Sequence, residues 1–225
     1  EIAQCLVGSE MCIRDRFTVH GYGLMIAIGV LSAYYMVEYR AKKKQMDWEK
    51  VFPLTVWSVL GGFLGSKILY LLTRLPDILA NPALLGSSIK DGFVVYGGII
   101  GGILTAWIYC KCTKWNFWKI FDIAMPAVAM AQGFGRIGCL LAGCCYGIKL
   151  DPANPIGIVF HNSAYAPNDV ALLPTQIISS VLDFANCFVL LALSKKLKTD
   201  GQVASCYLIF YSIGRFVLEY FRGDL

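Results

Sequence analysis

Long apolar runs separated by short polar segments dominate this chain. Six runs approach or reach the roughly 20 residues that a helix needs to cross about 30 Å of hydrocarbon. They cover residues 17–39, 51–72, 93–110, 119–141, 175–193 and 203–221. The pattern therefore predicts an all-α fold, a polytopic transmembrane helical bundle with about six spans.

Composition supports this fold class. The chain of 225 residues is 57% hydrophobic and only 16% charged, and its mean hydropathy is +0.59. A soluble domain of this length cannot bury that much apolar surface, so the expected environment is the lipid bilayer. The net charge of +5 is concentrated in short clusters between the apolar runs, which argues against nucleic-acid binding.

The basic clusters predict the topology. Lysines and arginines gather at residues 40–44, 111–119 and 195–198, and the positive-inside rule places these loops in the cytoplasm. The N-terminus, residues 75–91, the loop that follows residue 146 and the C-terminus then face outward. Residues 148–173 are long enough to form a small extracytoplasmic cap.

Both ends of the chain need separate treatment. Residues 1–16 contain no apolar run and resemble translated sequencing-adapter read-through, although a genuine polar tail is the alternative. We take residues 1–16 as a non-native or disordered leader and residues 17–225 as the transmembrane domain. The chain stops directly after the sixth run, so we expect a C-terminal helix to be missing.

The most distinctive stretch is the glycine-rich run 133–147, which contains Arg136. A charged side chain at the centre of a membrane costs about 2.5–3.5 kcal/mol even on a lenient insertion scale, so it needs a partner or a function. The glycines of this run allow backbone or a ligand to approach closely. An arginine in a small-residue pocket at membrane depth indicates an anionic lipid headgroup as its partner.

The sixth run carries a polar face. Tyr211, Arg215, Glu219 and Arg222 lie at helical spacing on one side. Glu219 can neutralise Arg215 one turn away, and a purely structural ion pair is one interpretation. Together with Arg136, however, the predicted spans hold two arginines and one nearby acid. Guanidinium groups bind phosphate bidentately, so this surplus of positive charge favours a phosphate ligand.

Other residues admit two interpretations each. Lys67 either extends its amine towards the outer surface or adds a third cation to the lipid pocket. Tyr22 and Tyr96 are either interfacial anchors or site residues. Gly97, Gly98, Gly101 and Gly102 form a small-xxx-small pattern that favours close helix packing. Asp122 lies too far along its helix to pair with Arg136, and the charge of a helix N-terminus accounts for it.

The nine cysteines lack zinc-binding spacing, so no metal site and no cofactor are expected. Three of them, Cys139, Cys144 and Cys145, cluster beside Arg136, where a cation would lower the pKa of a thiol. Most free cysteines in membranes are inert small hydrophobic residues.

Taken in order, these features resemble the prolipoprotein diacylglyceryl transferase family over roughly residues 17–224. The resemblance rests on Tyr22-Gly-Leu-Met, Lys67 with Tyr70, Gly97-Gly98, Asp122, Gly135-Arg136-Ile-Gly, Gly147, Pro174-Thr-Gln176, Tyr211, Arg215, Glu219 and Arg222. The family has seven spans in the bacterial cytoplasmic (inner) membrane. It transfers diacylglycerol from phosphatidylglycerol to the lipobox cysteine of prolipoproteins and releases glycerol phosphate.

The resemblance implies roles for these residues, with the active site near the outer leaflet. Arg136, Arg215, Tyr96 and Glu219 would be catalytic. Substrate would contact Arg136 and a further group: Tyr22, Lys67, Gly97, Gly98, Gly147, Gln176, Tyr211 and Arg222.

This chain also departs from the family pattern. Tyr96 stands where the family typically has His, and Cys139 and Cys144 stand where it has Asn and Glu. Leu173 replaces a His, and Ile178-Ser179 replace Tyr-Glu. The expected function is diacylglyceryl transfer. The alternatives are a non-enzymatic phospholipid-handling protein and, from the cysteine cluster, a membrane thiol oxidoreductase.

Overall fold

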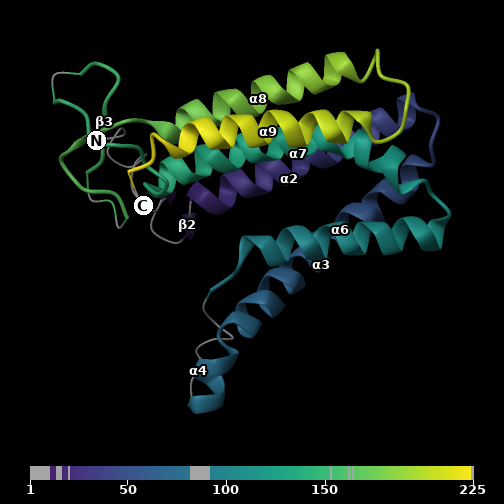
Figure 1. Ribbon diagram of the computed structural model, residues 1–225, viewed down its shortest axis with the longest axis horizontal. Helices are drawn as coiled ribbons and strands as arrows, with labels where there is room; N and C mark the ends of the chain where they lie inside the picture. Colours follow the sequence, from purple (N-terminus) through teal and green to yellow (C-terminus); the bar gives the residue numbers. More distant parts are fainter. Residues whose placement is uncertain are drawn as a thin grey trace. The chain divides into compact units, whose positions relative to one another are not determined.

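The chain folds into two compact units of mostly helical structure. The computed structural model describes residues 11–13, 17–19, 21–81, 92–152, 154–161, 163 and 165–223. The bundle unit comprises Glu1–Val37 and Phe121–Leu225, and the hairpin unit comprises Glu38–Ile120. Figure 1 shows the elements of both units with their labels.

In the described part of the chain, six long helices form most of the structure. They are α2 (Gly21–Lys43), α3 (Val51–Thr73), α6 (Val95–Thr113), α7 (Phe117–Ala142), α8 (Thr175–Leu193) and α9 (Gln202–Glu219). Shorter elements are β1 (Met11–Ile13), β2 (Phe17–Val19), η1 (Trp48–Lys50), α4 (Leu75–Ala80), β3 (Ile158–Val159) and β4 (Ala171–Leu172).

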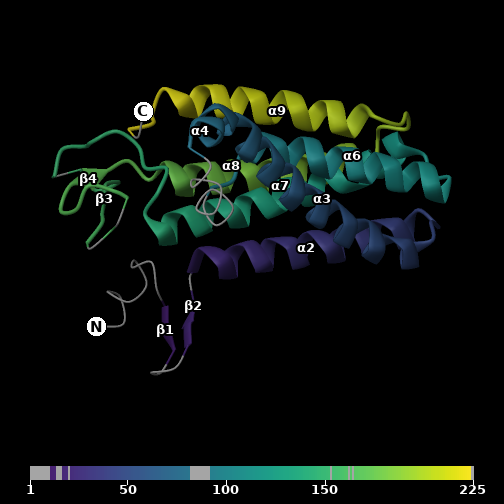
Figure 2. The same cartoon turned by 90° about the horizontal axis from the view of Figure 1, so that it is seen from below.

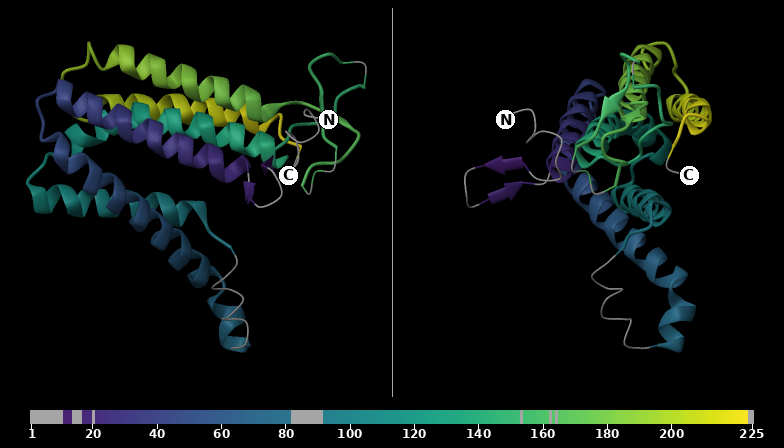
Figure 3. Two further views of the ribbon diagram at one scale, coloured as in Figure 1. Left: turned by 180° about the vertical axis from the view of Figure 1, so that it is seen from behind. Right: turned by 90° about the vertical axis from the view of Figure 1, so that its left-hand side faces the viewer.

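Helices α2, α7, α8 and α9 lie side by side in the bundle unit, as the three sets of views agree (Figures 1–3). Small residues on α7 permit this packing. A Cβ atom added at Gly138 would lie 3.1 Å from a ring carbon of Tyr22 on α2, and one at Gly133 would lie 2.8 Å from Phe184 on α8. Ser180 on α8 also donates a buried 2.9 Å hydrogen bond to the carbonyl of Gly133.

Helix α8 turns one polar face into the bundle. Its buried residues are Thr175, Gln176, Ser179, Ser180, Asp183, Cys187 and Leu190, which recur every three or four positions. A polar group in an apolar interior costs free energy unless it is hydrogen-bonded, so this face needs partners on the neighbouring helices. This face of α8 is therefore a candidate lining for a polar binding site inside the bundle.

The segment between α7 and α8 forms a small cap at one end of the bundle (Figure 2). Strands β3 and β4 pair antiparallel, with Ile158 opposite Leu172. Phe160, Ala166 and Leu172 form a separate buried cluster beneath them. The predicted cap over residues 148–173 is thus present as a packed element.

In the hairpin unit, α3 and α6 pack closely through glycines. A Cβ atom at Gly97 would collide with the backbone oxygen of Gly65, so the two backbones are nearly in contact. This packing confirms the small-xxx-small interpretation.

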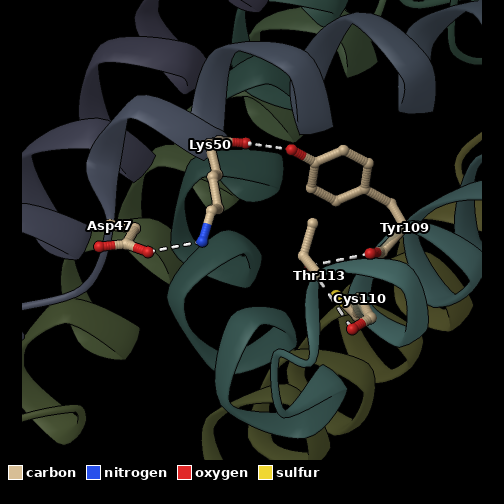
Figure 4. A network of polar contacts seen from close by, with 5 residues as sticks. All are labelled: Asp47, Lys50, Tyr109, Cys110 and Thr113. Atoms are coloured by element: carbon tan, nitrogen blue, oxygen red, sulfur yellow. Dashed lines mark hydrogen bonds and ion pairs between the residues drawn. The ribbon is translucent and has the colours of Figure 1, made fainter.

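Polar contacts close one end of this helix pair (Figure 4). The Tyr109 hydroxyl donates to the carbonyl of Lys50 over 3.2 Å, and the Lys50 amine pairs with Asp47 at 2.6 Å. Thr113 donates back to the carbonyl of Tyr109 at 2.8 Å. These contacts join the loop before α3 to the last turns of α6.

Among the residues that the structure describes, five helical segments are long and apolar enough to cross a membrane: Gly21–Lys43, Trp48–Thr73, Val95–Thr113, Phe117–Ala142 and Thr175–Leu193. The sixth predicted run forms α9, which is less apolar because it carries Arg215 and Glu219. The predicted start of the first span at residue 17 is wrong. Phe17–Val19 is a strand paired with β1, and the helix runs instead from Gly21 to Lys43. The last turn of α2 carries Arg40, Lys42 and Lys43, whose positive charges are favourable at the negative C-terminal end of a helix.

Candidate functional site

Arg136 lies on α7 in the bundle unit, among residues from three other helices. Tyr22 on α2 packs against Gly138, two residues after Arg136 on α7, and lies within electrostatic range of Arg136. A Cβ atom at position 138 would lie 3.1 Å from the Tyr22 ring, so the glycine allows α2 and α7 to approach closely here. The structure therefore brings together two of the predicted site residues that are more than 100 positions apart in sequence.

The polar face predicted for the sixth run is confirmed in α9 and just beyond it. A guanidinium nitrogen of Arg215 lies 2.6 Å from a carboxylate oxygen of Glu219, and Arg222 lies 3.5 Å from the other oxygen. Glu219 thus forms an ion pair with both Arg215 and Arg222. Such a pairing restricts the orientation of the guanidinium groups, each of which carries five N–H donors.

A cavity of about 40 Å³ lies between α7, α8 and α9. Its polar lining comes from Arg136, Ser179, Asp183, Asn186, Tyr211 and Arg215. The volume accommodates a few water molecules. Arg136 and Arg215, which the sequence placed 79 positions apart, therefore line one cavity, and the Tyr211 ring stacks on Tyr207 beside it.

Sequence reasoning missed Asp183. This carboxyl group is only 7% exposed, lines the same cavity as the arginines and lies within electrostatic range of Arg136. The prediction of a single acid near the arginines is therefore wrong. Among the described residues of this cluster, three arginines face Asp183 and Glu219, so one positive charge remains when both carboxylates are ionised.

A signal for Asp183 was present in the sequence. An ionisable residue inside an apolar run is a functional candidate by default, and Asp183 follows Gln176 by seven positions, which places both on one helical face. It also lies one turn after Ser179, where the resemblance implies a Glu. Ser179 and Asp183 line the same cavity, so this chain carries a carboxylate on that face, displaced by one turn.

Two side chains at the start of α8 hold the segment after α7 through its backbone carbonyls. Gln176, which is 1% exposed, donates from its side-chain amide to the carbonyl of Cys144 at 2.9 Å. Thr175 donates to the carbonyl of Cys145 at 2.8 Å. The second amide atom of Gln176, its Oε1, is buried without a hydrogen-bond partner. Gln176 therefore positions the loop at the end of α7.

Gly147 joins this loop to two further segments. Its N–H donates to the carbonyl of Leu173 at 3.0 Å, and a Cβ atom there would lie 2.7 Å from that same oxygen. Gly147 also forms a backbone bridge with Arg222. Its role in the structure is to allow three chain segments to meet.

The cysteine cluster predicted beside Arg136 is present. The sulfur atoms of Cys139, Cys144 and Cys145 all lie within 4.8 Å of one another. Hydrogen bonds with the other two thiols, followed by the charges of Arg136 and Arg222, lower the pKa of the Cys145 thiol from its ordinary value. The two arginines contribute in the direction expected of a nearby cation, but the hydrogen bonds between the thiols are the larger cause. The hydrogen bond with Cys139 lowers the pKa of the neighbouring Cys144 thiol, but its hydrogen bond with Cys145 and its burial outweigh that contribution, so this pKa is raised.

The remaining predicted site residues belong to the hairpin unit. Lys67 donates to the carbonyl of Gly92 at 3.1 Å, and its amine lies 4.7 Å from the centre of the Phe93 ring. Tyr96 is 74% exposed on α6. Gly97 and Gly98 face Gly65 and Gly62 on α3. Each of these residues is thus placed by contacts within its own unit or lies on its surface.

Asp122 has a structural role that differs from the predicted one. Its two carboxylate oxygens accept hydrogen bonds from the N–H groups of Gly201 and Ala204, at 2.8 and 2.9 Å. The acid therefore caps the N-terminus of α9, whereas the sequence predicted an interaction with its own helix. His161 pairs with Asp169 on the exposed cap, and His20 lies outside the described residues.

The apolar helices and this cavity define the class of protein: a multi-pass membrane protein with an arginine-lined polar cavity between its helices. Residues 11–225 match the family described as prolipoprotein diacylglyceryl transferase. The chain belongs to this family.

The sequence of this chain aligns with curated relatives over most of their length. The chain is 45% identical over 208 residues to a protein of Clostridium tetani named phosphatidylglycerol–prolipoprotein diacylglyceryl transferase, with 92% of this chain and 82% of the relative covered. It is 43% identical over 206 residues to a second such protein from Clostridium perfringens, with coverage of 92% and 80%. A relative of the same name from Staphylococcus carnosus is 31% identical over 211 residues, with coverage of 92% and 76%.

Proposed function

We propose that this protein transfers the diacylglyceryl group of phosphatidylglycerol to the lipobox cysteine thiol of prolipoproteins and releases glycerol phosphate. The family and the names of its relatives support this reaction. The structural observation that carries the proposal is the cavity that Arg136 and Arg215 line together. Guanidinium groups bind phosphate oxygens bidentately, so two of them beside one cavity suit the phosphodiester of a phospholipid.

The arginines would act on the leaving group. When the acceptor sulfur attacks the glyceryl carbon, the carbon–oxygen bond to phosphate breaks, and the oxygen that departs carries a second negative charge. Arg136 and Arg215 would stabilise that charge, and Glu219 would hold Arg215 in orientation through their 2.6 Å ion pair. Fixed donors aimed at developing charge are commonly the largest catalytic contribution.

Further residues would complete the site. Tyr211, Arg222 and Tyr22 would contact the lipid headgroup next to the arginines, and Gln176 and Gly147 would hold the loop that borders it.

The acceptor thiol must lose its proton before it attacks. Tyr96 remains the predicted base, with Lys67, Gly97 and Gly98 as predicted substrate contacts in the hairpin unit.

The proposed setting is the bacterial cytoplasmic membrane, with the cavity near the outer leaflet. The basic clusters at residues 40–44, 111–119 and 195–198 support this orientation. The partners are then phosphatidylglycerol, the signal peptides of prolipoproteins and the bilayer itself.

A second candidate is phospholipid handling without catalysis. The replacement of His by Tyr96, relative to the pattern that the resemblance implies, favours this alternative. Histidine is the commonest general base in enzymes, and a tyrosine hydroxyl serves that role less often.

Diacylglyceryl transfer to a lipobox peptide separates the two candidates. Membranes that contain the protein are incubated with phosphatidylglycerol and the peptide, and mass spectrometry reports any diacylglyceryl addition. We expect transfer by the wild type. The rate of transfer should fall at least about 100-fold in Arg136→Ala, because removing one group that stabilises charge in the transition state typically lowers kcat by that factor. Arg74→Ala is the matched control, since Arg74 lies at the end of α3 with a side chain that is 55% exposed.

The outcomes are distinct. Near-normal transfer by Arg136→Ala would contradict the assigned role of the arginine. Absence of transfer by the wild type, with phosphatidylglycerol still bound in an Arg136-dependent manner, would establish the non-enzymatic alternative.

A further inference from the structure

Three thiol groups meet at the end of α7. The sulfur atoms of Cys139, Cys144 and Cys145 lie within 4.8 Å of one another, and all three are free, partly buried thiols. An ion with metal–sulfur bonds of about 2.3 Å in tetrahedral geometry holds its sulfur ligands roughly 3.8 Å apart. The cluster can therefore close around one ion through small side-chain movements.

The backbone holds these cysteines in place before any ligand binds. The N–H of Cys144 donates to the carbonyl of Cys139 at 3.0 Å. The carbonyls of Cys144 and Cys145 accept hydrogen bonds from Gln176 and Thr175 at the start of α8. Cys145 has a φ of 59°, an unusual conformation for a residue other than glycine. Such conformations persist where the surrounding structure imposes them, often at ligand sites.

We propose that Cys139, Cys144 and Cys145 form a binding site for one thiophilic d¹⁰ metal ion of the Zn²⁺ class. Thiolate ligands select such ions over Mg²⁺ and Ca²⁺. A Zn²⁺ site with three protein ligands keeps its fourth position open to water or to another ligand. The three cysteines do not line the cavity shared by Arg136 and Arg215. Metal binding by them therefore does not depend on the proposed transferase activity.

Charge balance supports this occupant. Each thiol that is protonated when a divalent ion binds exchanges its S–H bond for a metal–sulfur bond and releases its proton to solvent, and three thiolates around one divalent ion leave the complex with one negative charge. Arg136 and Arg222 lie within electrostatic range of Cys145 and can compensate that charge. The sequence did not predict the site because the ligands come from a helix end and the turn after it, without the usual zinc spacing.

Cadmium titration tests the site directly, because Cd²⁺ bound to thiolates absorbs in the near ultraviolet. Detergent-purified, reduced, metal-free protein is titrated with Cd²⁺ and then with Zn²⁺ as the competitor. We expect one Cd²⁺ per chain, with affinity at least about 10-fold lower in each of Cys139→Ser, Cys144→Ser and Cys145→Ser. Cys112→Ser and Cys206→Ser are the matched controls, since these cysteines lie on α6 and α9, and they should bind like the wild type.

Two results would overturn the proposal. One is absorption in the wild type no greater than in the variant that lacks all three cysteines. The other is a disulfide between two of the three in protein taken from membranes without reductant, which would indicate dithiol chemistry instead. Because the three single variants change different positions, a folding defect in one, visible as a lowered thermal transition without metal, leaves the other two informative.

Discussion

At the scale of single residues, the charged side chains fall into two groups. Arg136 was predicted from its charge inside an apolar run, and Arg215 and Glu219 from their helical spacing. The structure places all three around or beside one cavity. Asp183 and the capping role of Asp122 were not predicted. Helical spacing shows which residues share a face of one helix, but the partner on another helix depends on packing that a single sequence does not contain.

Asp122 provides the residue-scale test. Asp122→Ala removes both acceptors from the N-terminus of α9, and hydrogen bonds to charged groups contribute about 1.5–3 kcal/mol each. We expect a clearly lowered thermal transition, followed by circular dichroism in detergent. Asp47→Ala is the control, because Asp47 is 66% exposed in its ion pair with Lys50 and such surface pairs contribute about 0–1 kcal/mol. Equal transitions for the two variants would contradict the capping role.

At the scale of helices, the apolar pattern predicted the elements well and their ends less well. The runs around 51–72, 119–141 and 175–193 agree with α3, α7 and α8 to within a few residues. The first run failed at its start because hydropathy alone does not separate an apolar strand such as Phe17–Val19 from a helix. Close contact between α3 and α6 was predictable because glycine spacing reports directly on backbone approach.

The helix pair of the hairpin unit yields a matched test. A Cβ at Gly97 would collide with the backbone of Gly65, whereas one at Gly102 would lie an ordinary 3.5 Å from Ser58. We expect Gly97→Ala to destabilise the protein by about 1–3 kcal/mol. Gly102→Ala should be neutral or slightly stabilising, since alanine favours helices over glycine. Thermal unfolding in detergent measures both, and a stable Gly97→Ala protein would refute the close packing.

At the scale of the whole molecule, the polytopic helical class followed from composition and apolar runs. The sequence could not predict the division into two compact units. That division depends on contacts between segments far apart in the chain, such as α2 with α7, and apolar periodicity carries no information about which helices pair.

Topology is the prediction that belongs to this scale. Ile156 in the cap is 62% exposed, and Cys112 lies at the end of α6 beside a basic cluster. In intact cells, we expect a membrane-impermeant maleimide to label Ile156→Cys above the background of its parent protein. Cys112 should react only after the membrane is permeabilised, with Cys112→Ser as the blank. Labelling in the opposite order would reverse the assigned orientation.

The meeting of α7, α8 and α9 has a consequence for biosynthesis. The cavity takes its lining from all three helices, and the loop after α7 is hydrogen-bonded to Phe221 and Gly223 beyond α9. A nascent chain that has inserted α7 and α8 therefore holds Arg136 and Asp183 before Tyr211 and Arg215 of α9 line the cavity with them. The cavity is completed only when α9 has left the ribosome and entered the membrane.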